Sequence, residues 1–180
     1  MSAKRNHRWI RRTLSYIALV TLVPCFSAGA AERQPINIEA DNAKIIEKEG
    51  KSVYKGNVLL IQGTTRMTAD IVTVYSRDNK LVRIIAKGSP VTYHKSSTAE
   101  SEDLSGQANV LEYLAEQQRI VLTEGAKLTQ GRTAFSGNRI EYNIKTDVVT
   151  AQTSESGKER VQVTIQPEKA NKPKSGANKP

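Results

Sequence analysis

The sequence predicts an all-β fold in which short, repeated antiparallel strands stack along one axis. A ten-residue block occurs four times, apolar residues alternate with polar ones inside each block, and no stretch after the leader shows helical periodicity over eleven residues. Alternation with a period of two is the pattern of a strand with one buried face. Self-similarity at a regular spacing is typical of stacked or rolled repeats.

The four blocks span residues 36–45, 65–74, 104–113 and 133–142, and each contains a small residue followed by Asp or Asn. The small residues stand at positions 40, 69, 108 and 137, so they recur after 29, 39 and 29 positions. The polar residues that follow them are Asp41, Asp70, Asn109 and Asn138. Because two of these four are Asn, we interpret them as an aligned ladder or a bulge at a bend and not as paired catalytic carboxylates.

Between the blocks, further strands are expected around polar turns. Turn composition occurs at residues 47–52, 76–80, 95–103, 115–118 and 154–158. Gly56 and Gly125 are expected to form corners, and Gly88-Ser89-Pro90 is expected to separate an apolar run at 81–86 from Val91. A last strand is expected from Val161 to Ile165. The spacing of eight to twelve residues is that of a sandwich, roll or barrel.

The first thirty residues are predicted to be a secretory signal peptide. Five basic residues precede an apolar run at 14–23, and Ala28-Gly29-Ala30 fits a cleavage site before Ala31. The run is half as long as the roughly twenty residues that a membrane-spanning helix needs. The expected organisation is therefore a signal peptide at 1–30, one domain at 31–165, and a disordered basic tail at 166–180.

The basic charge of the chain lies mostly outside the predicted domain. Of the net charge of +9, five units belong to the leader and three to the tail, so the domain between them is at about +1. No patch of basic and aromatic residues is left, and a nucleic-acid partner is not expected. Cys25, the only cysteine, leaves with the leader. An exported domain without disulfides indicates a bacterial periplasm.

The domain offers little for catalysis or metal binding. His94 is its one histidine and stands at a predicted loop edge, where we interpret it as an exposed strand-end residue. Only carboxylates are left as metal ligands, and the acidic stretch at 100–103 lacks the spacing of a calcium loop. No enzyme activity, metal or cofactor is expected.

The apolar faces carry few aromatic residues for a wide all-β interior. These aromatics are Tyr54, Tyr75, Tyr93, Tyr113, Phe135 and Tyr142. Composition leaves two readings equally open: an ordinary aliphatic core, or an interior partly open to an apolar guest.

Several short motifs, in their order and spacing, resemble the OstA-like family. They are Gln34-Pro35-Ile36-Asn37-Ile38-Glu39-Ala40-Asp41, Gly56-Asn57-Val58, Gln62-Gly63-Thr64, Ala69-Asp70 and Gly137-Asn138-Arg139-Ile140-Glu141-Tyr142. The resemblance covers residues 34 to about 165. It implies a twisted, open β-roll (jellyroll) whose interior holds the acyl chains of lipopolysaccharide during transport from the inner to the outer membrane.

The resemblance also implies sites and partners. The expected lipid-lining residues are Ile36, Ile38, Val58, Leu60, Met67, Val72, Val74, Val91, Tyr93, Leu111, Tyr113, Phe135, Ile140 and Tyr142. The expected edges for head-to-tail self-association are Ile36 and Ile38 at one end and Val161, Val163 and Ile165 at the other. Similar rolls on inner-membrane and outer-membrane components would continue the groove. A structural β-scaffold without lipid cargo, and a β-helical polysaccharide enzyme, are the alternatives.

Overall fold

The computed structural model describes residues 34–99, 101–154 and 160–167. The predicted signal peptide lies outside these residues, as does all of the predicted tail after Pro167. The described elements are β1 (Asn37–Glu39), β2 (Asn42–Ile46), the short 3-10 helix η1 (Glu47–Glu49), β3 (Lys51–Gln62), β4 (Thr65–Arg77), β5 (Lys80–Lys95), β6 (Leu104–Leu114), β7 (Arg119–Gln130), β8 (Thr133–Asn143), β9 (Val148–Gln152) and β10 (Gln162–Ile165). No helix in the described ranges is long and apolar enough to cross a membrane.

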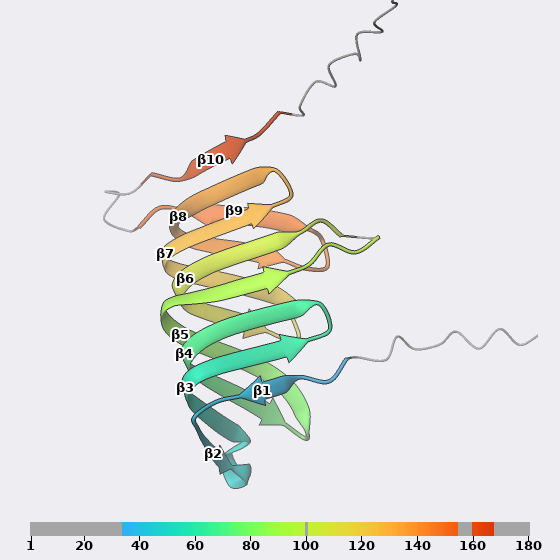
Figure 1. Cartoon of the computed structure of the whole chain (residues 1–180), viewed down its shortest axis with the longest axis vertical. Helices are drawn as coiled ribbons and strands as arrows, with labels where there is room; N and C mark the ends of the chain where they lie inside the picture. The colour runs from blue at the N-terminus through green and yellow to red at the C-terminus, as the bar shows by residue number, and fades with distance from the viewer. Residues whose placement is uncertain (1–33, 100, 155–159, 168–180) are drawn as a thin grey trace, which may run out of the picture. The chain divides into compact units, whose positions relative to one another are not determined.

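All strands belong to one antiparallel sheet in which each long strand pairs with the next along the chain, from β3 to β8. β1 and β2 both pair with β3 at one end, and β9 and β10 both pair with β8 at the other. Among the described strands, the first and last do not pair with each other, so the sheet is open. Figure 1 shows the strands stacked in two layers that meet along one side. The predicted all-β open roll is confirmed.

The repeated Asp/Asn positions lie where the sheet bends. The pairing register shifts between Lys55 and Val58 on β3 and between Thr68 and Ile71 on β4, beside Asp70. It shifts again around Asn109 on β6 and opposite Asn138 on β8. Extra residues at these shifts are β-bulges, which bend a strand and increase its twist. Of the two readings offered by the sequence, the bulge at a bend is correct.

Residues with a left-handed backbone conformation (positive φ) stand at these bulges. Gly56 and Asn57 on β3 have φ values of 81° and 45°, and Glu124 and Gly125 on β7 have values of 64° and 72°. A Cβ on Gly56 would stand 2.3 Å from the Asp41 carboxylate, whose Oδ2 accepts a hydrogen bond of 2.9 Å from Asn57 Nδ2. Glycine therefore meets both a backbone and a space requirement at this corner.

The bend divides the sheet into two walls, which we name by their outermost strands. The β1–β10 wall contains β1, residues 58–62, 65–69, 91–95, 104–108, 126–130 and 133–137, and β10. The β2–β9 wall contains β2, residues 51–55, 71–77, 80–87, 110–114, 119–123 and 139–143, and β9. The core lies between the walls because alternate side chains of both point inward.

The core is aliphatic and closely packed near the bend. Its largest fully buried side chains are Leu111, Leu122, Leu128, Ile140, Val58, Val72 and Val91. In the part of the chain that the structure describes, no buried side-chain polar atom lacks a hydrogen-bond partner. At about 25 cal/mol per Å² of buried apolar surface, this cluster supplies the main stabilisation of a domain without disulfides.

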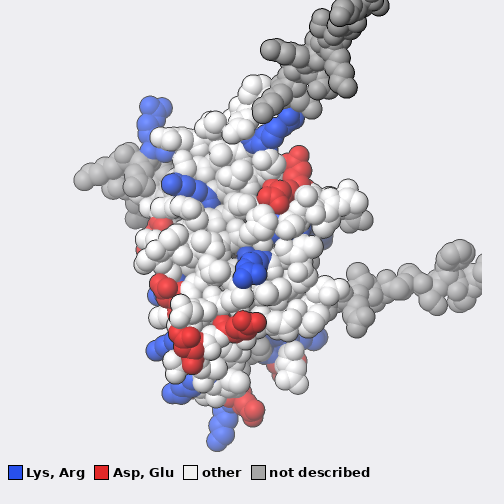
Figure 2. All heavy atoms as spheres, in the orientation of Figure 1, with Lys and Arg blue, Asp and Glu red and all other residues white. Residues whose placement is uncertain are grey.

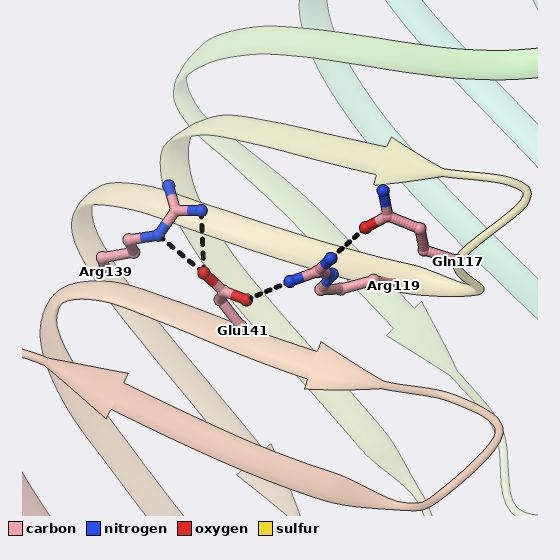
Figure 3. A network of polar contacts seen from close by, with 4 residues as sticks. All are labelled: Gln117, Arg119, Arg139 and Glu141. Carbon is pink, nitrogen blue, oxygen red and sulfur yellow. Dashed lines mark hydrogen bonds and ion pairs between the residues drawn. The ribbon is translucent and has the colours of Figure 1, made fainter.

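The outer faces carry charges of both signs, which are scattered over the face seen in Figure 2. On the β2–β9 wall, Glu141 accepts hydrogen bonds from Arg119 Nη1 (2.8 Å) and Arg139 Nε (2.9 Å) (Figure 3). These bonds, chiefly the one from Arg119, lower the pKa of Glu141 below its ordinary value. Val121 pairs with Glu141 on the neighbouring strand and is buried outside the core cluster.

Three local expectations differ from the structure. The corners at Gly56 and Gly125 do not end strands, because β3 and β7 continue through their bulges. Likewise β5 runs without a break through Gly88-Ser89-Pro90. Conversely, the first block is not one strand: it splits into β1 and β2 at Asp41, whose backbone N–H donates to the Gly56 carbonyl (3.0 Å). An edge strand has a partner on one side only, so it can break at the bend.

Candidate functional site

An apolar pocket of about 190 Å³ lies between the inner faces of the two walls, on the side away from the bend. Both walls contribute to it. Its lining residues are Leu60, Gln62, Thr65, Met67, Ile84, Tyr93, Lys95, Leu111, Tyr113, Ile120, Tyr142 and Ile144. They come from all six long strands, β3 to β8, and from Ile144 just after β8. The pocket therefore spans the stack of strands, and we call the space between the walls on this side the groove.

Three tyrosines from opposite walls face this pocket. Tyr93 lies on the β1–β10 wall, and Tyr113 and Tyr142 lie on the β2–β9 wall. Burial raises the pKa of Tyr93 above its ordinary value of 10.0, although a side-chain hydrogen bond with Thr65 partly offsets this. The pKa of Tyr142 is also raised above its ordinary value, chiefly by burial and in addition by the Asp147 carboxylate, to which its hydroxyl is hydrogen-bonded. Tyrosine side chains at this position give the groove an apolar body with polar tips.

The two walls are joined across the groove by a hydrogen-bonded bridge. Gln130 is the last residue of β7, at the border of the β1–β10 wall that is farthest from the bend. Asp147 lies in the turn after β8, at the corresponding border of the β2–β9 wall. Gln130 Nε2 donates to Asp147 Oδ1 at 2.6 Å, and the Tyr142 hydroxyl donates to the same oxygen at 2.8 Å. We call Gln130, Tyr142 and Asp147 the cross-groove bridge.

The turn that presents Asp147 is held by its own hydrogen bonds. Asn143 Oδ1 accepts bonds of 3.0 Å from the backbone N–H groups of Lys145 and Thr146. Asp147 itself has a φ of 57°, a conformation that Asp and Asn tolerate better than most residues. The carboxylate is thus directed back over the groove by local turn chemistry.

His94 occupies an exposed position on the outer face of the β1–β10 wall. Its Nδ1 lies 3.1 Å from Ser105 Oγ and its Nε2 lies 3.7 Å from Asp103 Oδ1. No group of three or more metal-ligating side chains occurs among the residues that the structure describes. His94 is thus an exposed residue one position before the end of β5, in contact with other polar groups of the outer face.

All fourteen residues predicted to line the interior belong to the apolar cluster between the walls or pack against it. Six of them also line the pocket: Leu60, Met67, Tyr93, Leu111, Tyr113 and Tyr142. Of the other eight, Val58, Val72, Val91 and Ile140 are fully buried core residues, whereas Ile36, Ile38, Val74 and Phe135 are partly buried. Contact of any of them with a lipid belongs to the proposal below.

Sequence reasoning missed six pocket residues. They are Gln62, Thr65, Ile84, Lys95, Ile120 and Ile144. Ile84 and Ile120 continue the strand alternation and were accessible from the pattern. Lys95 was assigned to an exposed loop, but it is the last residue of β5 and is half-buried at the pocket. Its alternation with Val91 and Tyr93 was the available signal.

The predicted association edges lie at the two ends of the sheet, with differences in detail. Ile38 is in β1, and Ile36 directly precedes that strand. Val163 and Ile165 are in β10, where they are 51% and 72% exposed, whereas Val161 precedes the strand. The sequence reasoning did not include β2 and β9, which form the remaining half of each end.

Comparison with known proteins gives consistent matches over most of the chain. Residues 37–148 match the family described as LptA/(LptD N-terminal domain) LPS transport protein. The lipopolysaccharide export system protein LptH of Pseudomonas aeruginosa is 30% identical over 142 residues, covering 76% of this chain and 81% of that protein. The lipopolysaccharide export system protein LptA of Escherichia coli K12 is 28% identical over 185 residues, covering 99% of this chain and 98% of that protein.

A solved structure shares the architecture. The crystal structure of LptH, described as the LptA-homologous periplasmic component of the lipopolysaccharide transport device of Pseudomonas aeruginosa, matches with a TM-score of 0.68 at 29% identity. The match covers 74% of this chain and 96% of that chain.

Proposed function

Because the chain belongs to the LptA/LptD N-terminal domain family of lipopolysaccharide transport proteins, we propose that it carries lipopolysaccharide with the acyl chains held in the groove between its two walls. The observation that carries this proposal is the apolar pocket that both walls line. The family is one of transport proteins and not of enzymes, in agreement with the sequence analysis.

The physical need for such a groove follows from the cost of exposing acyl chains to water. Burying one methylene group lowers the free energy by about 0.8 kcal/mol. Transfer of several chains of about a dozen carbons into water therefore costs tens of kcal/mol. A series of similar grooves allows transfer between sites of nearly equal free energy. In that case no single unit traps the lipid.

Photo-crosslinking from the groove tests the proposal. A photoreactive residue at Tyr113, which lines the pocket, is expected to form an adduct with lipopolysaccharide in intact cells. The same residue at Thr92, which is exposed on the outer face of β5, is the matched control and is expected to form none. Equal labelling at both positions, or none at Tyr113, contradicts the carrier function and favours a β-scaffold without lipid cargo.

We also propose head-to-tail association through the open ends of the sheet. β10 pairs only with β8 among the described strands, and its residues are exposed. Unpaired edge strands of this kind add further strands readily. An inner row of successive strand partners reaches both ends of the sheet and is apolar apart from one glycine: Ile38, Leu60, Met67, Tyr93, Gly106, Leu128, Phe135 and Val163. Joining β10 of one copy to β1 of the next would extend this apolar row.

The direction of backbone groups on β10 gives a selective test of association. The N–H of Gln166 donates to the Arg132 carbonyl (3.1 Å), so by alternation the N–H of Thr164 points to β8 and that of Val163 points to the free edge. Val163→Pro is expected to abolish self-association and leave thermal unfolding of the monomer within about 2 °C, because proline removes only an unpaired donor. Sedimentation velocity measures the first and circular dichroism the second.

Thr164→Pro is the matched control, since it removes the donor that holds β10 on β8. It is expected to expose β10 to proteolysis. Undiminished association of the Val163→Pro variant contradicts assembly through this edge.

For localisation, we propose the periplasm, with similar domains on inner-membrane and outer-membrane components as partners. Two points support it: the residues at 1–30 have the composition of an export signal, and the matched LptH is described as a periplasmic component. Cell fractionation of the full chain, with and without residues 1–30, checks this directly.

A further inference from the structure

One row of inward-facing residues forms the rim of the groove on the β1–β10 wall. Strand pairing places Gln62 opposite Thr65, Thr65 opposite Lys95, and Lys95 opposite Leu104, and the row continues to Gln130 and Thr133. Three neighbours in this row, Gln62, Thr65 and Lys95, also line the pocket. The rim is therefore polar where the pocket below it is apolar.

Lys95 is distinctive within this arrangement. Of the described residues that line the pocket, it alone carries a formal charge. Its side chain is half-buried, and no carboxylate in the described ranges lies within ion-pair distance of its ammonium group. A lysine that only kept the surface soluble would have no need to alternate with Val91 and Tyr93 on the inner face.

Two acidic side chains near the rim have other partners. Asp103 lies 3.7 Å from His94 on the outer face, and His94 also contacts Ser105 there. Asp147 accepts hydrogen bonds from Gln130 and Tyr142 in the cross-groove bridge. Lys95 therefore lines an apolar pocket without an ion-pair partner among the described residues.

An amphiphile bound with its chains in the pocket would bring the junction between its chains and its head to this rim. Lipopolysaccharide has phosphate groups at that junction, on the sugars that bear the acyl chains. A half-buried ammonium binds phosphate with a charge-assisted hydrogen bond, which is about twice as strong as a neutral one. The positive charge at the rim is complementary to the negative charge of such a phosphate.

We propose that Lys95 binds a phosphate on the head of the acylated lipid carried in the groove and makes the protein selective for phosphorylated over dephosphorylated lipid. This inference rests on the proposed lipid-carrier function. It adds a specificity-determining residue to that function. Lys95 acts through contact with the lipid and not by positioning another residue.

The test compares two probes: bisphosphorylated lipid A and the same lipid after enzymatic removal of its phosphates. Binding is measured by displacement of a fluorescent acyl probe at fixed ionic strength. Lys95→Gln is expected to weaken binding of the phosphorylated lipid about tenfold, as loss of one charge-assisted hydrogen bond predicts, and to leave the dephosphorylated lipid unchanged. Lys95→Arg is expected to restore the preference.

Lys127→Gln is the matched control, because Lys127 is exposed on the outer face of the same wall and the charge change is identical. It is expected to leave both affinities unchanged. An equal loss for both lipids in Lys95→Gln, an equal loss in Lys127→Gln, or no loss at all overturns the proposal. If the unaltered protein binds neither lipid, the carrier function itself is wrong, and the two failures are thus distinguished.

Discussion

A covalent link across the groove between positions 130 and 147 is expected to abolish lipid loading, with recovery when the link is cut. The variant carries Gln130→Cys and Asp147→Cys, joined by a short thiol-reactive linker that a reductant cleaves. The two side chains already meet at 2.6 Å, so a short linker spans them. Cys25 is the only native cysteine and lies in the predicted leader, so the domain from residue 31 adds no competing thiol.

The expected loss follows from the size of the pocket. Its volume of about 190 Å³ is below the roughly 300–1,000 Å³ of sites that hold drug-sized ligands. Several acyl chains need more room than this, so we expect the walls to separate on loading and the cross-groove bridge to open. We expect uptake of lipopolysaccharide by the linked protein to fall by at least tenfold, measured by co-elution, and to return after reduction.

A linker within one wall provides the control. Thr68 and Thr92 are opposite each other on β4 and β5, and their hydroxyl oxygens lie 2.5 Å apart on the outer face. Thr68→Cys and Thr92→Cys, linked in the same way, join neighbouring strands without joining the walls. Loading of this control should match the unlinked protein. Full loading of the linked 130–147 variant would mean that the lipid enters without separation of the walls at this point.

Shortening Ile140 is expected to produce a large loss of stability. Ile140 is 0% exposed and lies between Leu122 on β7 and Ala151 on β9. Ile140→Ala removes three buried carbons and leaves a cavity that strands pinned on both sides cannot close. The expected cost is about 2–5 kcal/mol of the free energy of unfolding, measured by urea titration with an unchanged m value.

Val148→Ala on β9 is the comparison, because Val148 is 52% exposed. Its expected cost is within about 0.5 kcal/mol. If the two substitutions cost the same, the apolar face that contains Ile140 is not the packed core of the domain.

The bends of the sheet were largely predictable from sequence. A small residue followed by Asp or Asn, repeated at positions 40, 69, 108 and 137, marks the line where the register shifts. The pattern could not show whether the strands end or continue there, because glycine corners fit both outcomes. Pairing with both neighbours keeps β3, β5 and β7 continuous, whereas β1 and β2, with one neighbour each, separate.

The rim of the groove was less predictable. Lys95 stands beside Ser96 and Ser97, and composition alone assigned it to a loop. The strand extends through Lys95 because its partners Thr65 and Leu104 on both sides belong to strands that reach equally far. Local composition carries no information about how far the neighbouring strands extend.

By itself, the sequence determined the strand alternation, the line of the bend and therefore which side chains face the interior, because each depends on a period of two within a single strand. Only the tertiary structure decided which residues meet across the groove. Gln130, Tyr142 and Asp147 share no spacing that marks them as partners, and the twist of the two walls brings them together. The tertiary structure also decided that Lys95 lines the pocket.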